Sequence, residues 1–366
     1  MASPQPAPRP PPALPRPPPS SSSSSATGYS LLSGRIPAPL QRLFDAFPLA
    51  TYPPNDLPAR CPLPAERDLP TLHVFISDED AARGRPSFNP TCLKWQTFLK
   101  IAGVDLRLVS STNHASPSGA LPFLLPPIVA AADPPVSSKS PPPTSPNPAP
   151  IPAHKLQAYA RAHGTTTTTT TTTTAPPPPG QQAAAAAEPA YAALLDHAVR
   201  RAWLHALYVS PANAPLAARL YLAPASRHPL VRSALRAKLR AAAAAELAST
   251  RNGVDPPPEA ELYADARAAL AALAQQLLPP ETETEVEEEG SRTPSSGWFF
   301  GAAAPGMFDA AVFAYTHLLL PGSGLEWVDR RLPEAVEAFP ALVAHRARML
   351  ARLWDEEGAA GEWEKV

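Results

Sequence analysis

SFNPTCLKWQTFLKIAGVDLRLVSSTNHASPSGALPFLLP, residues 87–126, is the stretch that decides the fold. Asn89 and Pro90 are typical of a helix start, as the N-cap and the first helical residue, and Gly103 is typical of a left-handed C-cap. Between them, large or apolar side chains recur at i, i+3, i+4 and i+7, at Trp95, Phe98, Leu99 and Ala102. This spacing predicts a helix with one buried face.

Three short segments around this helix are predicted to be strands. Residues 70–78 and 104–109 alternate between apolar and polar positions, and Pro122 opens an apolar run at residues 121–125. The predicted order is therefore strand, helix, strand, a polar loop and strand.

The second half of the chain is predicted to be helical, because long segments have the helical hydrophobic period or an alanine-rich composition. The expected helices cover residues 152–163, 188–209, 229–249, 258–278, 306–320 and 333–354, the last being one helix or a helix pair bent at Pro340. Gly306 is expected at an N-cap, with Asp309 reaching back to its backbone as in a capping box. An α/β unit followed by an all-helical unit makes the predicted fold class α+β.

Composition separates the parts expected to fold from the rest. The chain has 366 residues and 53 prolines, and its proline, alanine and threonine runs have little apolar surface to bury. We therefore predict disordered Pro/Thr-rich segments and roughly 230 residues that fold. The expected parts are a disordered tail and docking segment at 1–68, an α/β domain at 69–163 with a proline-rich insertion at 127–150, a low-complexity linker at 164–186, and an all-helical domain at 187–356 with an acidic loop at 281–297.

Charge and residue patterns argue against several classes of function. The formal net charge of −1 gives no global basic field for a nucleic-acid partner. Cys61 and Cys92 form no CxxC pair, which favours a reducing compartment. The sequence has no apolar run long enough to span a bilayer, and its N-terminus has neither a secretory nor a matrix-targeting pattern, so any membrane contact is expected to be peripheral. No metal and no cofactor are expected, because histidine pairs with ligand spacing and glycine-rich phosphate loops are missing.

The order of elements resembles the glutathione-transferase-type fold, a thioredoxin-like N-terminal domain followed by an all-α C-terminal domain. Asn89-Pro90 stands where transferases and glutaredoxin-like relatives commonly have a Cys-Pro pair or its equivalent. An amide cannot form a thiolate, so we interpret Asn89 as a structural N-cap. Pro122 resembles the cis-proline of these folds. Pro152-Ala153 stands where a glutathione site requires an acidic residue followed by serine, so both halves of that site are expected to be missing.

Within this superfamily, several blocks resemble fungal metaxin-type proteins. They are scattered over about residues 70–354: Cys92–Leu99, Asn113–Leu124, Leu194–His197, Arg200–Trp203, Trp298–Gly301 and Pro305–Ala310. The resemblance implies a peripheral subunit of the mitochondrial sorting and assembly machinery, on the cytosolic face of the outer membrane. It implies as partners the barrel-forming core subunit, a second metaxin-like subunit and β-barrel precursor proteins.

The first candidate binding surface is the loop at residues 113–119. Asn113, His114 and Ser116 are polar residues just before Pro122, where related folds hold an extended peptide or glutathione. The alternative is a hydrogen-bonded turn that positions Pro122.

A second candidate surface contains Arg200 and Arg201, beside Asp196 and His197, in a cluster that would face a groove between the two halves. The alternative is a solvated helix face with an i,i+4 pair between Asp196 and Arg200.

Three further side chains are interpreted as structural. Cys92 lies one turn inside the predicted helix, where a helix N-terminus can lower the pKa of a thiol, but a small buried residue is the interpretation we favour. Trp95 and Trp203 fall on the apolar faces of their helices and are expected in the core.

Together these observations favour a non-enzymatic subunit that helps to receive β-barrel precursors and insert them into the outer membrane. An extended precursor segment could pair with a strand edge near the 113–119 loop. The alternatives are a glutathione-dependent transferase or reductase, and a cytosolic scaffold with a transferase-like fold.

Overall fold

The computed structural model describes residues 68–128, 149–165, 179–249, 257–278 and 297–354. The described residues all belong to the unit Pro53–Val366. Residues 1–67 of the predicted tail and docking segment, most of the proline-rich insertion, all but the first residue of the threonine run and almost all of the acidic loop lie outside them.

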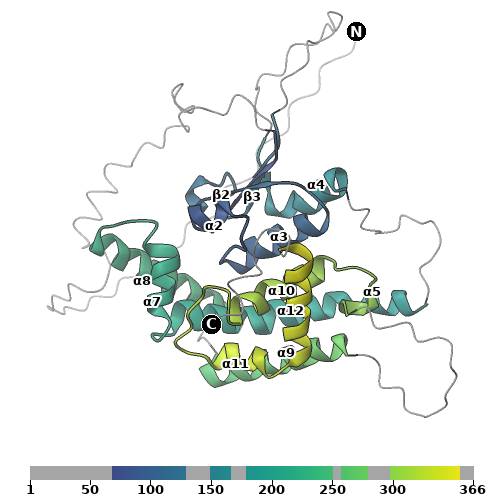
Figure 1. Ribbon diagram of the computed structural model, residues 1–366. Helices are drawn as coiled ribbons and strands as arrows, with labels where there is room; N and C mark the ends of the chain where they lie inside the picture. Colours follow the sequence, from purple (N-terminus) through teal and green to yellow (C-terminus); the bar gives the residue numbers. More distant parts are fainter. Residues whose placement is uncertain (1–67, 129–148, 166–178, 250–256, 279–296, 355–366) are drawn as a thin grey trace, which may run out of the picture. The chain divides into compact units, whose positions relative to one another are not determined.

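A four-stranded mixed sheet forms the first part of the fold (Figure 1). The strands are β1 (Thr71–Val74), β2 (Arg107–Ser110), β3 (Phe123–Leu125) and β4 (Ile151–Pro152). They are arranged in the order β2-β1-β3-β4, with β1 parallel to β2 and antiparallel to β3, and with β3 antiparallel to β4. The apolar residues of β1 and β3 lie in the core, where Leu72, Val74 and Leu124 are fully buried.

Two details of the sheet differ from the sequence prediction. The first strand ends at Val74, well before residue 78, because Ser77 caps a short helix, α2 (Asp78–Ala82), by accepting a hydrogen bond from the Asp80 amide at 3.1 Å. The fourth strand was not predicted, since two residues that include a proline carry no alternating pattern. It closes a hairpin with β3, and the proline-rich insertion lies between these two strands.

The helix α3 (Pro90–Ile101) connects the parallel strands β1 and β2. Its buried surface is wider than the predicted stripe, because Cys92, Leu93, Gln96 and Thr97 are buried together with Phe98 and Leu99. Trp95 is only partly buried and packs edge-on against Phe98, so its predicted place in the core is only partly correct.

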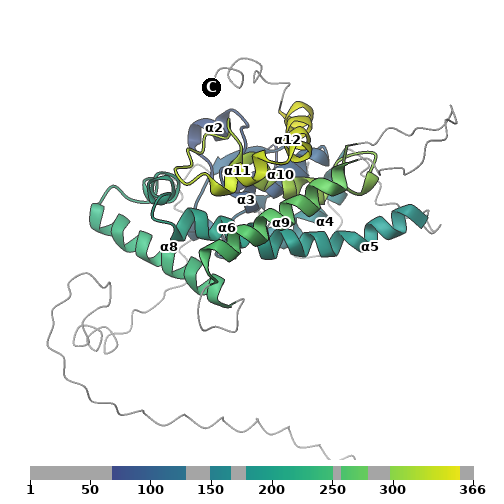
Figure 2. The same cartoon turned by 90° about the horizontal axis from the view of Figure 1, so that it is seen from below.

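The helix α4 (Leu156–His163) follows the sheet, and the helical part begins after it. Its described α-helices are α5 (Pro179–Leu194), α6 (Arg200–Leu204), α7 (Ala214–Ala217), α8 (Pro229–Ser249), α9 (Glu259–Leu277), α10 (Met307–Leu319), α11 (Arg331–Glu337) and α12 (Pro340–Leu353). In Figure 2, α9 lies beside α6, α11 and α12, and all three contact it.

Two regions of the helical part differ from the sequence prediction. The helix expected at 188–209 is interrupted by π-helical turns at Leu195–Val199 and His205–Val209. The turn η5 (Ala218–Leu222), also π-helical, follows α7, and neither element was predicted. At residues 333–354 the helix pair is the correct alternative, because α11 ends at Glu337 and Pro340 is the first residue of α12.

The helix α10 is the centre of the fold. Every residue from Phe308 to Leu319 is buried, and the helix contacts α3, α11 and α12. Because α3 belongs to the sheet-containing part and α10 to the helical part, the two parts share one continuous core.

A buried carboxylate holds the start of α10. Asp309 is 2% exposed and accepts hydrogen bonds from the Gly306 amide at 2.9 Å and the Phe299 amide at 3.2 Å. His345 Nε2, on α12, lies 3.0 Å from the same carboxylate. Asp309 therefore ties together the N-terminus of α10, the Phe299–Gly301 turn and α12.

A second buried polar group lies near the end of α10. His317 is 1% exposed, stacks on Phe313 and lies 3.4 Å from the Nε atom of Arg346. Desolvation, and then the charge of Arg346, lower the pKa of His317 to about 3. Its imidazole is therefore neutral in the folded protein at neutral pH and can accept the Arg346 hydrogen bond.

Asp309→Ala is expected to lower the free energy of unfolding by about 3–5 kcal/mol, because the buried Phe299 amide and His345 lose their hydrogen-bond partner. Urea unfolding monitored by circular dichroism measures this loss. The exposed Asp265 on α9 provides the matched control, and Asp265→Ala should change stability by less than about 0.5 kcal/mol. Equal midpoints for the two variants would contradict the proposed role of Asp309.

The lowered pKa of His317 predicts that the free energy of unfolding decreases as the pH falls. Its pKa falls from an ordinary value of 6.5 to about 3, so the unfolded chain binds the extra proton first as the pH drops. The stabilising contribution is fully present above pH 6.5 and is lost progressively toward pH 3. Between pH 6 and 4, wild type should lose up to about 1.4 kcal/mol per pH unit more than His317→Gln, measured as unfolding free energies in urea. Parallel profiles for the two proteins would exclude this assignment.

Candidate functional site

The candidate site is the N-terminus of α3, where the resemblance places the reactive residue of a transferase. Asn89 is the N-cap, and its side-chain oxygen accepts a hydrogen bond from the Cys92 amide at 3.2 Å. Its side-chain nitrogen donates to the hydroxyl of Tyr221 at 3.1 Å. Both ends of the amide are therefore engaged, one within α3 and one with the helical part of the fold.

Four aromatic side chains occupy the space next to Asn89, and we call them the aromatic cluster: Phe75, Phe88, Tyr208 and Tyr221. Tyr221 packs edge-on against Phe75 at 5.2 Å and Phe88 at 5.4 Å between ring centroids. Tyr208 lies 5.7 Å from Tyr221. Phe75 and Phe88 both precede α3 in sequence, whereas the tyrosines come from the π-helical turns of the helical part. The cluster thus joins the two parts at the start of α3.

The ionisable groups around this site are held in their neutral forms. Burial raises the pKa of the Cys92 thiol to about 12, against smaller lowering effects of the Phe75 backbone and the Ser87 hydroxyl. Desolvation raises the pKa of Tyr208 to about 12. Desolvation, and then Tyr208, raise the pKa of Tyr221 well above its usual value. A thiol this reluctant to ionise is a poor nucleophile at neutral pH, because the thiolate is the reactive form.

A buried hydrogen-bond network fixes the segment that leads into α3. The Ser87 hydroxyl donates to the Phe75 carbonyl at 2.6 Å, and the Ser87 amide donates to Gln96 Oε1 at 2.8 Å. Gln96 Nε2 donates to the Arg85 carbonyl at 2.8 Å. Ser87 and Gln96 are both fully buried, so this network holds Asn89 in place independently of any ligand.

The helix after the β3–β4 hairpin would carry the second half of a glutathione site. Pro152 ends β4, the turn Ala153–Lys155 follows, and α4 begins at Leu156 without a side-chain cap. His154 and Lys155 are exposed there. This end of the helix thus presents basic groups in place of a carboxylate and a serine hydroxyl.

Hydrogen bonds to the residues that follow it hold the 113–119 loop in place. The Asn113 side-chain oxygen accepts the Leu121 amide at 3.0 Å, and the Ser116 hydroxyl donates to the Ala120 carbonyl at 2.7 Å. The Leu121–Pro122 peptide bond that follows is cis. These contacts favour the interpretation of the loop as a turn that positions Pro122. Among the candidate residues of this loop, His114 presents an exposed side chain.

Arg200 and Arg201 are not gathered with Asp196 in a shared cluster. Arg200 forms an ion pair with Glu246 of α8, and Arg201 donates to the His197 carbonyl at 3.4 Å. The expected Asp196–Arg200 pair is therefore wrong, because the π-helical turn at Leu195–Val199 shifts the i,i+4 geometry on which it depends. Desolvation lowers the pKa of Arg200, but its hydrogen bond and charge interaction with Glu246 outweigh this, and the net shift is upward.

The remaining structural candidates lie in the interior. Trp203 is 3% exposed and packs edge-on against Trp327 at 5.1 Å and Tyr315 at 6.0 Å. Gly306 is the N-cap of α10. The part of the chain that the structure describes holds no group of three or more His, Cys, Asp or Glu side chains placed to bind a metal ion.

Sequence reasoning missed Tyr208 and Tyr221. Residues 214–222 contain no polar marker of a site, and the contact between Asn89 and Tyr221 spans 132 positions. A tyrosine at the end of a short apolar segment was the one available signal, and it is not specific.

Asn89 and Tyr221 are expected to be energetically coupled. In a double-mutant cycle, Asn89→Ala and Tyr221→Phe should show an interaction energy of about 0.5–1.5 kcal/mol, because both remove the same hydrogen bond. Unfolding free energies from urea titrations give the cycle. Tyr191→Phe, whose hydroxyl accepts from Gln276 at 2.7 Å, is the control, and its effect should add to that of Asn89→Ala. Additive effects in both cycles would mean that the contact contributes no stability.

Two family models match the chain in the order that this architecture requires. The model of the glutathione S-transferase N-terminal domain matches residues 90–140, and that of the glutathione S-transferase C-terminal domain matches residues 294–349. No curated protein sequence matches. Among solved structures, a glutathione S-transferase from Xanthobacter autotrophicus Py2 is similar at 14% identity and a TM-score of 0.34, over 77% of this chain and 93% of that one.

The two domain matches, together with the mixed sheet and the helices that follow it, confirm the predicted fold class. The chain has the glutathione-transferase-like fold, a thioredoxin-like N-terminal domain followed by an all-helical C-terminal domain.

Proposed function

We propose that this protein is a non-enzymatic, metaxin-like subunit of the mitochondrial sorting and assembly machinery. It would act at the cytosolic face of the outer membrane, bind the barrel-forming core subunit and a second metaxin-like subunit, and help to receive β-barrel precursors. The observation that carries the non-enzymatic part of the proposal is the hydrogen bond between Asn89 and Tyr221. Through this hydrogen bond, the residue at the position of the transferase nucleophile contacts the other domain.

The chemistry of the site supports this proposal. Thiol transfer requires a group that ionises near neutral pH, or a donor directed at the thiolate of glutathione. Here the amide of Asn89 is engaged at both ends, and burial raises the pKa of Cys92 to about 12. Glutathione would also have to displace the aromatic cluster to reach the start of α3.

A precursor could be received at the edge of the sheet. The terminal strand β2 pairs only with β1 among the described strands, and it ends at Ser110, just before the 113–119 loop. An extended segment can add to such an edge through main-chain hydrogen bonds. The exposed His114 is the side chain of the loop best placed to contact it without a structural role of its own.

Native electrophoresis of detergent-solubilised outer membranes tests the proposal. The protein should migrate in a large complex together with a barrel-forming membrane protein, and β-barrel precursors should crosslink to it. His114→Ala should reduce precursor crosslinking at least about twofold and leave the complex intact, whereas the exposed control His154→Ala should change neither. Migration as a free dimer would favour the cytosolic scaffold instead.

The transferase alternative has its own discriminating measurement. In a Cys61→Ser background, native Cys92 should react with a thiol reagent at pH 8 about 1000-fold more slowly than in urea, because its pKa lies about three units above the ordinary value of 9.0. The protein should also not be retained on immobilised glutathione. Rapid reaction of Cys92, together with glutathione conjugation that Cys92→Ser abolishes, would overturn the non-enzymatic assignment.

A further inference from the structure

Charge is distributed very unevenly along the helical domain. From His197 to Ala245 the chain has no Asp or Glu, although the whole protein has a formal net charge of −1. The same segment contains eight basic residues: Arg200, Arg201, Arg219, Arg227, Arg232, Arg236, Lys238 and Arg240. Five of these lie in or just before α8, so a strong positive potential is expected around this helix.

Most of α8 contributes little to the core. Of its 21 residues, only Ala243 and Leu247 are buried, and both lie in its C-terminal third. Arg232, Arg236 and Arg240 follow one another at i, i+4 and i+8 and therefore share one face of the helix. The apolar stripe of the helix, at Leu235, Leu239, Ala243 and Leu247, is half-buried or buried and lies beside this arginine face.

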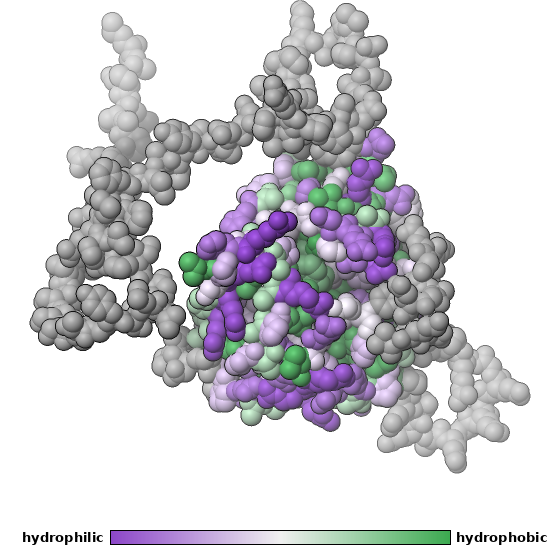
Figure 3. All heavy atoms as spheres, turned by 60° about the vertical axis from the view of Figure 1, so that its left-hand side comes forward, coloured by the Kyte–Doolittle hydropathy of each residue, from purple (hydrophilic) through white to green (hydrophobic). Residues whose placement is uncertain are grey.

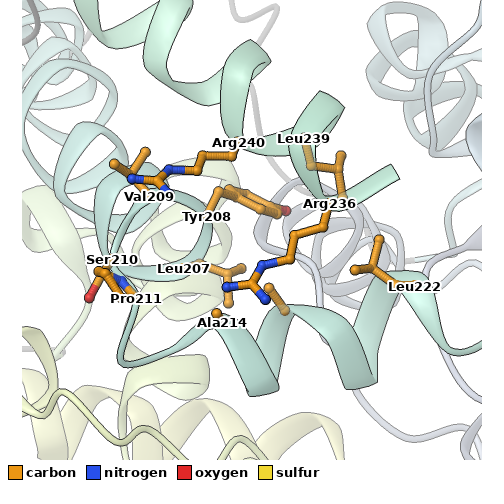
Figure 4. Close-up of a pocket in the computed structure, with 11 residues that line it drawn as sticks. Leu207, Tyr208, Val209, Ser210, Pro211, Ala214, Leu222, Arg236, Leu239 and Arg240 are labelled. Carbon is orange, nitrogen blue, oxygen red and sulfur yellow. The ribbon is translucent and has the colours of Figure 1, made fainter. Parts of the chain in front are cut away.

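An open pocket lies beneath this row of arginines. It encloses about 360 Å³, part of it open solvent, between α8 and the segment that runs from η4 (His205–Val209) to η5. The side chains of Arg236 and Arg240 reach from α8 across the pocket toward Tyr208 and the 207–214 segment (Figure 4). Two guanidinium groups that line one open pocket are suited to binding a phosphate group.

Few carboxylates among the described residues compensate these cations. Glu246, the acidic residue of α8, is paired with Arg200, and Arg232 donates to the Ser226 carbonyl at 2.6 Å. Arg236, Lys238 and Arg240 lie within 4.0 Å of no carboxylate in the part of the chain that the structure describes. Like charges four residues apart destabilise a helix. Contacts among the described residues therefore do not offset the mutual repulsion of these side chains.

The start of α8 adds exposed aliphatic side chains to this charge. Leu230 is 74% exposed and Val231 is 44% exposed, next to each other and between Arg227 and Arg232. Figure 3 brings forward the side on which α8 lies in Figure 1, and strongly hydrophilic side chains gather there, with hydrophobic ones among them. A cationic surface with a projecting aliphatic pair is typical of proteins that bind the interface of an anionic bilayer.

We propose that α8 binds the surface of a bilayer that contains anionic phospholipids. The basic α8 surface consists of Arg227, Leu230, Val231, Arg232, Arg236, Lys238 and Arg240. Its cations bind headgroup phosphates, one of them held between Arg236 and Arg240, and Leu230 and Val231 reach the boundary between headgroups and acyl chains. The described helices include none that is long and apolar enough to cross a bilayer, so the proposed contact is interfacial.

The aliphatic pair favours a bilayer over a nucleic acid. Single-stranded RNA binds to cationic surfaces through phosphates and through stacking of bases on exposed aromatic rings. Leu230 and Val231 offer no aromatic surface for bases to stack on. Their transfer from water to the boundary between headgroups and acyl chains lowers the free energy. This inference goes beyond the proposed function and does not depend on it, because it requires no protein partner.

Vesicle co-sedimentation of the full chain tests the proposal. Binding is expected to vesicles of phosphatidylcholine with 30% phosphatidylserine, on the order of the anionic content at which juxtamembrane basic clusters bind, and not to phosphatidylcholine alone. Each basic residue near such a surface contributes about fivefold to partitioning, so Arg236→Gln/Lys238→Gln/Arg240→Gln should weaken binding about 100-fold. All three side chains are exposed, so the variant should fold, which circular dichroism checks.

Two matched controls separate this surface from general charge or hydrophobicity. Arg161→Gln/Arg267→Gln/Arg352→Gln removes three exposed arginines elsewhere and should retain binding within about threefold. Leu230→Ser/Val231→Ser should weaken binding about tenfold, whereas Leu69→Ser/Val328→Ser, which changes an exposed aliphatic pair elsewhere, should not. The proposal is overturned if the wild-type protein does not bind anionic vesicles, or if it binds poly(U) RNA but not vesicles. It is also overturned if the α8 triple variant and the control triple variant lose vesicle binding equally. Failure of these tests would leave the sorting-complex proposal unaffected, since that depends on co-migration with a membrane protein.

Discussion

The carboxylate of Asp309 is the constraint on which much of this fold depends. It is buried at the start of α10, the helix that contacts both the sheet-containing domain through α3 and the last helices of the chain. A buried carboxylate is tolerated only when its acceptor sites are satisfied, and here two backbone amides and the His345 ring surround it. The hydrogen bonds fix where α10 begins. The position of α10 in turn fixes which side chains meet α3.

The same packing is the physical basis of the non-enzymatic proposal. The two domains of such a fold meet at the start of α3, where an enzyme needs space for its substrate. In this protein the meeting point is filled by Tyr221 and its aromatic neighbours, and the Asn89 amide holds the contact in place. The consequence is a domain interface with neutral, engaged groups in place of an ionisable nucleophile.

The α8 region differs from the rest of the helical domain in its excess of positive charge. Several exposed arginines elsewhere are paired, as in the contacts of Arg331 with Asp329 and Glu259. Arg236, Lys238 and Arg240 of α8 have no carboxylate within 4.0 Å among the described residues, and Arg236 and Arg240 line the pocket beside this helix. The central helices have buried apolar faces, whereas three cations of α8 have no partner among the described carboxylates and are available to bind an external anion.

Local patterns were sufficient to predict several features. Asn89-Pro90 at one end of α3 and Gly103 after the other mark the helix because capping depends on neighbouring residues alone. The same holds for Gly306 and Asp309 at α10, and the order of a small sheet followed by helices led to the correct fold class. The π-helical turns were beyond such reasoning, because their i→i+5 hydrogen bonds are set by packing and leave the hydrophobic period nearly unchanged.

The sequence by itself determined the helix start at Asn89, the central helix at Gly306, the α+β order and the charge imbalance around α8. Tertiary structure alone decided which distant residues these side chains contact. Asn89 meets Tyr221 across 132 positions, Asp309 meets His345 across 36, and Arg200 pairs with Glu246 rather than Asp196. The physical reason is that capping and hydrophobic periodicity act over a few residues, whereas these contacts depend on how separate helices pack together.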